Sequence, residues 1–300
     1  MTAAQIIWVL AAVIAAGAQT ARNTLQASLT ASLGALGATF VRFVFGLPFG
    51  ILFCVAAALA QGGFPQPNAI FLAWTMIGAL SQIAATALML TAMQERSFVV
   101  VTVYTKTELV QAALLGALLL GDVPGPHALL AVLVASAGVL LASWPGSIRS
   151  GDQIAAFRPA LFGIAAGGIF SLAAVGYRGA ALALGDSGFV ARAGLTLAVA
   201  LAIQTALMAL WFGLRDRATL VAVARAWRPS LVAGFMGAFA SFGWFIAFTL
   251  TTAANVKMVG LIEIGFAWIV SRRVFGSGLL LREILGMALI VGSIVAVLSV

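Results

Sequence analysis

The chain has 300 residues, of which 63% are hydrophobic and only 8% are charged, whereas an average soluble domain has roughly 25% charged residues. Apolar runs long enough to cross a hydrocarbon core of roughly 30 Å recur along the whole length, and no hydrophilic stretch is long enough for a separate soluble domain. The net charge of +8 comes mostly from arginines in short connectors, a pattern typical of membrane topology determinants and not of a nucleic-acid surface. The composition predicts an all-α polytopic membrane protein.

Turn residues and charges divide the chain into ten apolar segments, each predicted to be a transmembrane helix. In chain order they cover residues 4–22, 34–60, 68–93, 98–121, 126–144, 158–182, 188–213, 229–252, 255–276 and 282–300. The first segment lacks the basic start of a signal peptide, so we expect it to be retained. Seven of the eight prolines fall in or beside connectors, whereas Pro48 lies within the second segment and is expected to kink it.

The two halves of the chain show a weak internal repeat. A shift of 155 residues aligns Glu108 with Glu263, and a shift of 150 residues aligns Arg42 with Arg192. Because each half would hold five helices, an odd number, the two halves must have opposite orientations in the membrane. We therefore expect two inverted five-helix repeats, residues 1–150 and 151–300, an architecture that favours alternating-access transport.

Several short patterns resemble those of a known transporter superfamily. In the first half they are ATFVRF, TEL followed by ALLLGD, and LLAVLVASAGVLLAS, and in the second half they are LIEI and REILGMALIVGSIVAV. With these patterns the chain resembles the drug/metabolite transporter superfamily, in its ten-helix, EamA type, over essentially its whole length. Within the superfamily it looks most like the bacterial aromatic amino-acid exporters.

Four charged residues inside predicted helices are candidates for ion pairs or for coupling. A charge at the bilayer centre costs roughly 2.5–3.5 kcal/mol, so such residues usually face protein or a water-filled cavity. In a regular helix Lys106 lies about 200° from Glu108 and is not expected to pair with it. The repeat instead suggests that Glu108 pairs with Arg42 and that Glu263 pairs with Arg192. Such pairs could fix helix packing, or their carboxylates could couple protons or gate a substrate.

A second group of residues is expected to line a substrate cavity. Lys106 could attract a carboxylate there or could snorkel to the interface. Aromatic rings could stack on a flat substrate or pack in the core, and amides could line the cavity or bridge helices. The cavity candidates are Gln19, Gln82, Tyr104, Lys106, Phe170, Tyr177, Phe242 and Trp244. Lys257, near the start of the ninth predicted helix, is expected to be an interfacial anchor.

The motifs of common enzyme classes are absent from the sequence. There is no HExxH, GxSxG or Walker A pattern, and one histidine with one cysteine makes no zinc cluster, so we expect neither catalysis nor a metal or other cofactor. The resemblance implies a secondary transporter that exports amino acids, aromatic and other neutral ones, or similar small metabolites. Proton coupling is left open. The alternatives are a drug or cationic-compound/proton antiporter of the same superfamily, an intramembrane enzyme, and a non-transporting assembly subunit.

The resemblance also implies a multi-pass protein of the bacterial inner membrane. The arginines in connectors concentrate after the odd-numbered predicted helices. By the positive-inside rule, this distribution would place both termini in the periplasm. Superfamily members usually have cytoplasmic termini, so the two indications of orientation disagree.

Overall fold

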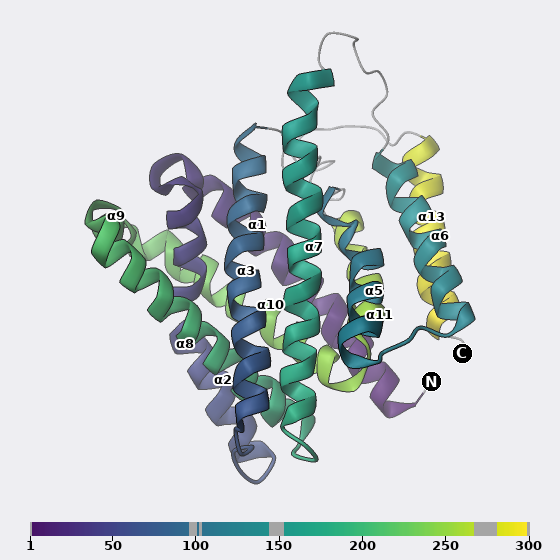
Figure 1. The fold of residues 1–300 in the computed structure, drawn as a ribbon, viewed down its shortest axis with the longest axis horizontal. Coiled ribbons are helices and arrows are strands. Elements are labelled where there is room, and N and C mark those ends of the chain that lie inside the picture. The colour runs from purple at the N-terminus through teal and green to yellow at the C-terminus, as the bar shows by residue number, and fades with distance from the viewer. Residues whose placement is uncertain (1, 96–100, 102–103, 144–152, 267–280, 299–300) are drawn as a thin grey trace.

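The structure, a computed structural model, describes residues 2–95, 101, 104–143, 153–266 and 281–298. These residues form α-helices joined by turns and short loops. The helices are α1 (Ala3–Val44), α2 (Leu47–Ala60), α3 (Ala69–Glu95), α5 (Glu108–Leu120), α6 (Pro126–Ser143), α7 (Gln153–Ala183), α8 (Phe189–Arg215), α9 (Arg217–Arg225), α10 (Trp227–Leu250), α11 (Ala253–Gly260) and α13 (Leu281–Leu298) (Figure 1). Six of the ten predicted helices correspond closely to α3, α6, α7, α8, α10 and α13. Parts of the fourth, fifth, ninth and tenth predicted segments lie outside the described residues.

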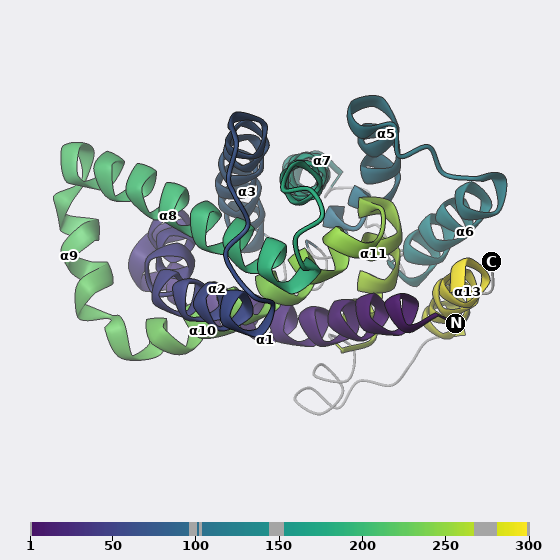
Figure 2. The ribbon, with the colours of Figure 1, turned by 90° about the horizontal axis from the view of Figure 1, so that it is seen from below.

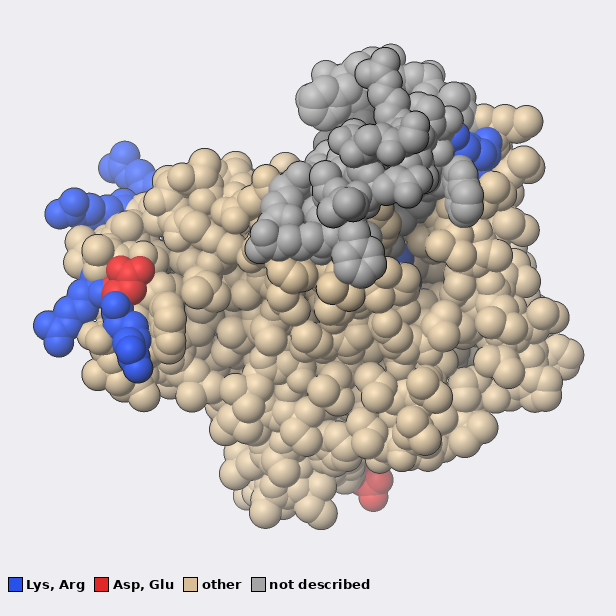
Figure 3. All heavy atoms as spheres, turned by 45° about the horizontal axis from the view of Figure 1, so that its top comes forward, with Lys and Arg blue, Asp and Glu red and all other residues tan. Residues whose placement is uncertain are grey.

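The polarity of the fold is reversed relative to that of a soluble protein. Leu59 and Leu214 are 79% and 73% exposed, whereas Gln26, Gln204 and Glu263 are at most 1% exposed. The face shown in Figure 3 is largely uncharged, and a group of Lys and Arg side chains lies at the end where Figure 1 places α9. In the described parts of the chain, five helical spans are long and apolar enough to cross a membrane. The chain is therefore an all-α polytopic membrane protein.

The main helix pairs each join a helix from residues 1–150 to one from residues 151–300. The most extensive contacts are those of α3 with α7, α1 with α10, α6 with α13, and α2 with α8. Figures 1 and 2 both show α6 and α13 side by side at one end of the molecule, close to both chain termini. The hydrophobic core thus lies between the two halves of the chain and not within each half.

The first predicted helix does not end at residue 22, because α1 continues through the polar segment 23–33. Hydroxyl groups in this segment donate to carbonyl oxygens three or four residues earlier, for example Thr24 to Thr20 (3.0 Å) and Ser28 to Leu25 (2.7 Å). Because these groups are satisfied within the helix, a polar segment can remain helical in apolar surroundings. The bend occurs at Gly34, whose φ of 68° suits glycine.

The irregularity expected at Pro48 lies just before it, where only Phe45 and Gly46 separate α1 from α2. Both residues keep backbone angles of a right-handed helix, and Pro48 occupies the first turn of α2. Proline is tolerated there because the first amides of a helix have no partner within the helix.

The segment between the seventh and eighth predicted helices contains an additional short helix, α9. Asp216 caps its start, since its carboxylate accepts hydrogen bonds from the backbone amide (3.1 Å) and the hydroxyl (2.7 Å) of Thr219. These hydrogen bonds hold the pKa of Asp216 below its ordinary value. The capping interaction is therefore complete above the ordinary pKa of an aspartate and is lost as the pH falls through the lowered one.

The contact between α3 and α7 depends on small residues. A Cβ atom added at Gly176 would lie 2.9 Å from the backbone nitrogen of Gly78 and 3.1 Å from the carbonyl oxygen of Trp74. We expect Gly176→Ala to lower the free energy of unfolding by about 1–3 kcal/mol, because two backbones must separate. The measurement is unfolding in sodium dodecyl sulfate followed by circular dichroism. Gly213→Ala is the control, because nothing lies within 4 Å of the added atom; equal effects of the two changes would contradict this account.

Candidate functional site

Two breaks interrupt helices that were predicted to be continuous. A turn at residues 106–107 precedes α5, and the amide of Leu109 donates to the carbonyl of Lys106 (3.3 Å). In the second half α11 ends at residue 260, and the amide of Ile264 donates to the carbonyl of Leu261 (3.0 Å). Each bond spans three residues instead of four, and the second lies 155 residues after the first. The prediction of unbroken helices at 98–121 and 255–276 was wrong at these points, and residues 106–107 include no glycine or proline that would indicate a break.

Glu263 lies directly after the second break and has three partners. Its Oε2 accepts from Lys106 Nζ (2.5 Å) and from Gln19 Nε2 (3.1 Å). Its Oε1 accepts from Asn23 Nδ2 (3.2 Å). Trp244 Nε1 in turn donates to Gln19 Oε1 (3.0 Å), which fixes the orientation of that amide. Glu263 therefore accepts hydrogen bonds from one ammonium group and two amide groups.

Glu108 begins α5, directly after the first break. Its Oε2 accepts from Lys257 Nζ (2.9 Å), and its Oε1 lies 3.8 Å from Lys106 Nζ. Lys257 Nζ also lies 6.0 Å from the ring centroid of Phe170 and 5.8 Å from that of Trp244, within the range of cation–π attraction. The expectation that Lys257 is an interfacial anchor was therefore wrong, since it closes a buried chain of four charges.

The structure contradicts the ion pairs suggested by the repeat. Glu108 pairs with Lys257 instead of Arg42, and Glu263 pairs with Lys106 instead of Arg192. The expectation that Lys106 is not paired with Glu108 also fails. The two arginine pairs were inferred from the repeat, whereas the expectation for Lys106 assumed a regular helix. The turn at 106–107 interrupts that helix, and Lys106 Nζ lies 3.8 Å from Glu108 Oε1.

The two arginines of the predicted pairs lie in different places. Arg42 is buried and donates to the hydroxyl groups of Thr86 (3.3 Å) and Ser241 (3.2 Å). Arg192 is only partly buried and donates to the carbonyl of Ala181 (3.3 Å), near the start of α8. Arg42 therefore faces the interior of the protein, whereas Arg192 connects α8 to the end of α7.

The buried charges surround a small central cavity between helices of both halves. Its free volume is about 50 Å³, which suits a few water molecules. Six of the eight cavity candidates line it, namely Gln19, Gln82, Lys106, Phe170, Tyr177 and Trp244. Lining residues that the sequence did not assign to the cavity include Arg22, Met89, Thr105, Ser241, Phe245 and Lys257.

Two cavity candidates lie elsewhere. Tyr104 packs against α7, where a Cβ atom added at Gly163 would lie 2.5 Å from the tyrosine Cβ. Phe242 stacks on Phe53, with ring centroids 5.3 Å apart and an interplanar angle of 20°. Both rings stabilise contacts between helices, the alternative that the sequence had left open for aromatic residues.

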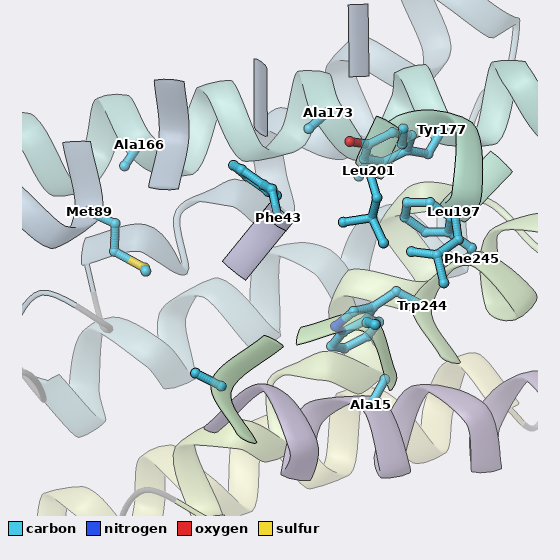
Figure 4. Close-up of a cluster of buried hydrophobic side chains, with 14 of the residues drawn as sticks. Ala15, Phe43, Met89, Ala166, Ala173, Tyr177, Leu197, Leu201, Trp244 and Phe245 are labelled. Carbon is cyan, nitrogen blue, oxygen red and sulfur yellow. The ribbon is translucent and has the colours of Figure 1, made fainter. Parts of the chain in front are cut away.

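Beside the charges lies a hydrogen-bonded group of uncharged polar residues. Tyr177 Oη donates to Gln82 Oε1 (2.8 Å), and Gln204 Nε2 donates to that same oxygen (2.8 Å) and lies 3.1 Å from Tyr177 Oη. The Tyr177 ring packs on Phe245 with centroids 4.3 Å apart, and Figure 4 shows both rings next to Leu197 and Leu201 of α8. The tyrosine thus connects the cavity to the hydrophobic core.

Arg22 is the cavity residue that the sequence analysis missed most clearly. It belongs to a polar series, Gln19, Arg22, Asn23 and Gln26, whose spacing of three and four residues places them on one face of a helix. This spacing predicts a shared helix face if the helix continues past residue 22. Because the first helix is predicted to end at residue 22, the predicted elements divide the series between a helix and a connector.

A separate ion pair connects the end of α5 to α7 and α10. The guanidinium of Arg178 forms a two-point contact with Asp122, through Nε to Oδ2 and through Nη2 to Oδ1 (3.0 Å). Its Nη1 donates to the carbonyl oxygens of Phe248 (3.0 Å) and Thr251 (2.6 Å) at the end of α10. Arg178 thereby satisfies carbonyl groups that have no partner within α10.

We expect Asp122→Asn to lower the free energy of unfolding by about 1–2 kcal/mol, because the change removes the negative charge and the amide nitrogen cannot accept the second hydrogen bond from Arg178. The matched control is Asp186→Asn, which removes an exposed carboxylate between α7 and α8 and should change stability little. Both variants can be compared with the parent protein by unfolding in sodium dodecyl sulfate. An Asp122→Asn effect no larger than that of the control would show that the contact is not stabilising.

Comparison with known proteins finds a similarity to one protein family in the first half. Residues 4–144 match the model of the EamA-like transporter family. A solved structure described as "Crystal structure of protein" is similar in fold, with a TM-score of 0.64 and 19% sequence identity over 99% of this chain and 96% of that chain. No match is found among curated proteins. Residues 4–144, just under half of the chain, are thus similar to the EamA-like transporter family.

Proposed function

We propose that the protein is a secondary transporter that moves small metabolites across a membrane by alternating access through the central cavity. The observation that carries the proposal is the chain of buried charges Lys257–Glu108–Lys106–Glu263 at the two helix breaks. Charges and broken helices inside a membrane are costly and usually mark a substrate or ion path. The match of the first half to a transporter family agrees with this function.

Two further observations support an inverted repeat of residues 1–150 and 151–300 with five spans each. In such a repeat α1 corresponds to α7, α2 to α8, α3 to α10 and α6 to α13. Exchanging each helix for its counterpart converts the α1–α10 contact into the α7–α3 contact and returns the α2–α8 and α6–α13 contacts to themselves. The two helix breaks are also separated by the repeat distance of 155 residues. Alternating access would then consist of a rocking motion of one half against the other around the cavity.

As the substrate class we propose amino acids, aromatic and other neutral ones, or similar small carboxylates, exported across a bacterial inner membrane. The cavity combines ammonium and guanidinium groups, which attract a carboxylate, with the aromatic rings of Phe170, Tyr177 and Trp244. Its present space of about 50 Å³ is too small for such a molecule. Substrate entry therefore requires a second conformation, as alternating access implies. A cationic drug is supported less well, because both lining carboxylates already pair with lysines.

The test is uptake of labelled phenylalanine into liposomes that contain the purified protein. We expect saturable uptake above that of empty liposomes, suppressed by other neutral amino acids but not by a cationic dye. Suppression by the dye alone would favour the drug antiporter. No flux from demonstrably folded protein, with phenylalanine or with any competitor as the labelled compound, would contradict the transport function.

A further inference from the structure

The cavity wall has an excess of positive charge. Its cationic side chains are Arg22, Arg42, Lys106 and Lys257. Its carboxylates are Glu108 and Glu263. Among the described residues the wall therefore holds four positive and two negative groups, an excess of two positive charges. A site of low dielectric with uncompensated charge attracts ions of the opposite sign.

The excess belongs to the two arginines, because each carboxylate already has a lysine partner. Lys257 pairs with Glu108 (2.9 Å) and Lys106 pairs with Glu263 (2.5 Å). Neither Arg22 nor Arg42 forms an ion pair with a carboxylate in the part of the chain that the structure describes. The lysines and glutamates thus form a neutral group of four. Glu263 also attracts Arg22 electrostatically, but neither arginine has a carboxylate within ion-pair distance among the described residues.

The hydrogen bonds of the arginines go to uncharged groups and leave donors available. Arg22 donates through Nε (3.2 Å) and Nη2 (2.5 Å) to Asn23 Oδ1, and its Nη1 has no partner among the described residues, although the side chain is only 2% exposed. Within the described part of the chain, Arg42 donates to the hydroxyl groups of Thr86 and Ser241 and to no charged group. A buried guanidinium with unsatisfied donors is costly unless an anion completes it.

The side chains of Arg22 and Arg42, both from α1, pack next to each other against α10. A Cβ atom added at Gly237 would lie 3.1 Å from Arg42 Cγ and 3.3 Å from Arg22 Cδ. Because Gly237 has no side chain, both arginine side chains can pack against α10 at this residue. Two like charges held side by side repel each other, and an anion bound to both relieves that repulsion.

We propose that Arg22 and Arg42 together form an anion-binding site in the cavity, and that the transported substrate is a carboxylate with a net negative charge. This inference rests on the proposed transport function and, within the substrate class proposed above, favours small carboxylates over neutral amino acids. A carboxylate can accept two hydrogen bonds from a guanidinium fork. An ammonium group on the same molecule finds no free carboxylate among the lining residues described, so a zwitterion binds less well than a simple carboxylate.

The test compares three probes that share a phenyl ring but differ in charge: phenyllactate is anionic, phenylalanine is zwitterionic and phenethylamine is cationic. In liposomes containing the purified protein we expect phenyllactate to be transported best and phenethylamine worst. Arg22→Gln and Arg42→Gln should each weaken half-maximal phenyllactate transport about 30-fold, the effect of removing a buried charged partner. Arg22→Lys should recover part of the loss, because it restores the charge without the fork. Arg192→Gln, which removes a guanidinium outside the cavity wall, should behave like the parent protein.

A binding measurement separates failure of the site from failure of transport. Phenyllactate added to the detergent-solubilised protein should raise its unfolding temperature, and the two glutamine variants should lose that shift. Binding without flux would support the anion site and refute transport. Flux without preference for the anionic probe would refute the anion site and leave transport intact. If chloride or inorganic phosphate displaces phenyllactate at equal concentration, the site is for an inorganic ion and the substrate assignment is wrong. The comparison of probes on the parent protein decides the question even if the glutamine variants do not fold.

Discussion

Replacement of Lys106 by methionine is expected to lower the free energy of unfolding by about 3–5 kcal/mol and to stop transport. Lys106 Nζ lies between two carboxylates, 2.5 Å from Glu263 and 3.8 Å from Glu108, and the side chain is 5% exposed. Methionine has a similar length but no charge. It leaves Glu263 with only the two amide donors of Gln19 and Asn23, which do not compensate a buried negative charge.

A double-mutant cycle with Glu263→Gln distinguishes a coupled pair from two independent effects. Unfolding in sodium dodecyl sulfate would be measured for both single variants and for the double variant. We expect the double variant to be more stable than the sum of the single losses predicts, because neither partner is left unpaired. Strict additivity would show that the pair is not coupled. Arg217→Met, on exposed α9, is the control for loss of a cation and should have little effect.

Truncation of Trp244 to alanine is expected to cost about 3–5 kcal/mol, as for a large aromatic residue in a packed core. The ring is 7% exposed, and a Cβ atom added at Gly260 would lie 2.8 Å from its Cη2. The change also removes the hydrogen bond to Gln19 and the cation–π contact with Lys257. Figure 4 shows the ring close to Ala15 of α1, so the truncation would leave a void between α1, α10 and α11.

The same change at an exposed tryptophan provides the control for this prediction. Trp211, on α8, is 47% exposed, and Trp211→Ala should change the unfolding temperature far less than Trp244→Ala. Trp244→Phe should recover most of the packing but not the hydrogen bond to Gln19. If Trp244→Ala were as mild as Trp211→Ala, the ring would not be part of the packed core.

Class and secondary structure could be predicted well from the sequence because the membrane constrains both. Inside a bilayer every backbone polar group must be satisfied within its own segment, so long apolar runs must be helices. The helices α3, α8 and α10 therefore lie close to where hydropathy placed them. The positions of the buried amides and charges also indicated a cavity, since Gln19, Lys106 and Glu263 have little reason to be in apolar helices unless they face one another.

The tertiary structure decided which charges meet. The breaks at residues 106–107 and at residue 261 each contain a hydrogen bond that spans three residues, and each directly precedes a glutamate that pairs with a lysine. A repeat in the sequence can align Glu108 with Glu263, but it cannot show which lysine reaches each carboxylate. The extension of α1 past residue 22, which brings Arg22 next to Arg42, likewise depended on hydroxyl groups bonded within the helix. Periodicity specifies the face of a regular helix, whereas a break of one or two residues rotates everything after it, so the partners of a buried charge depend on packing between helices.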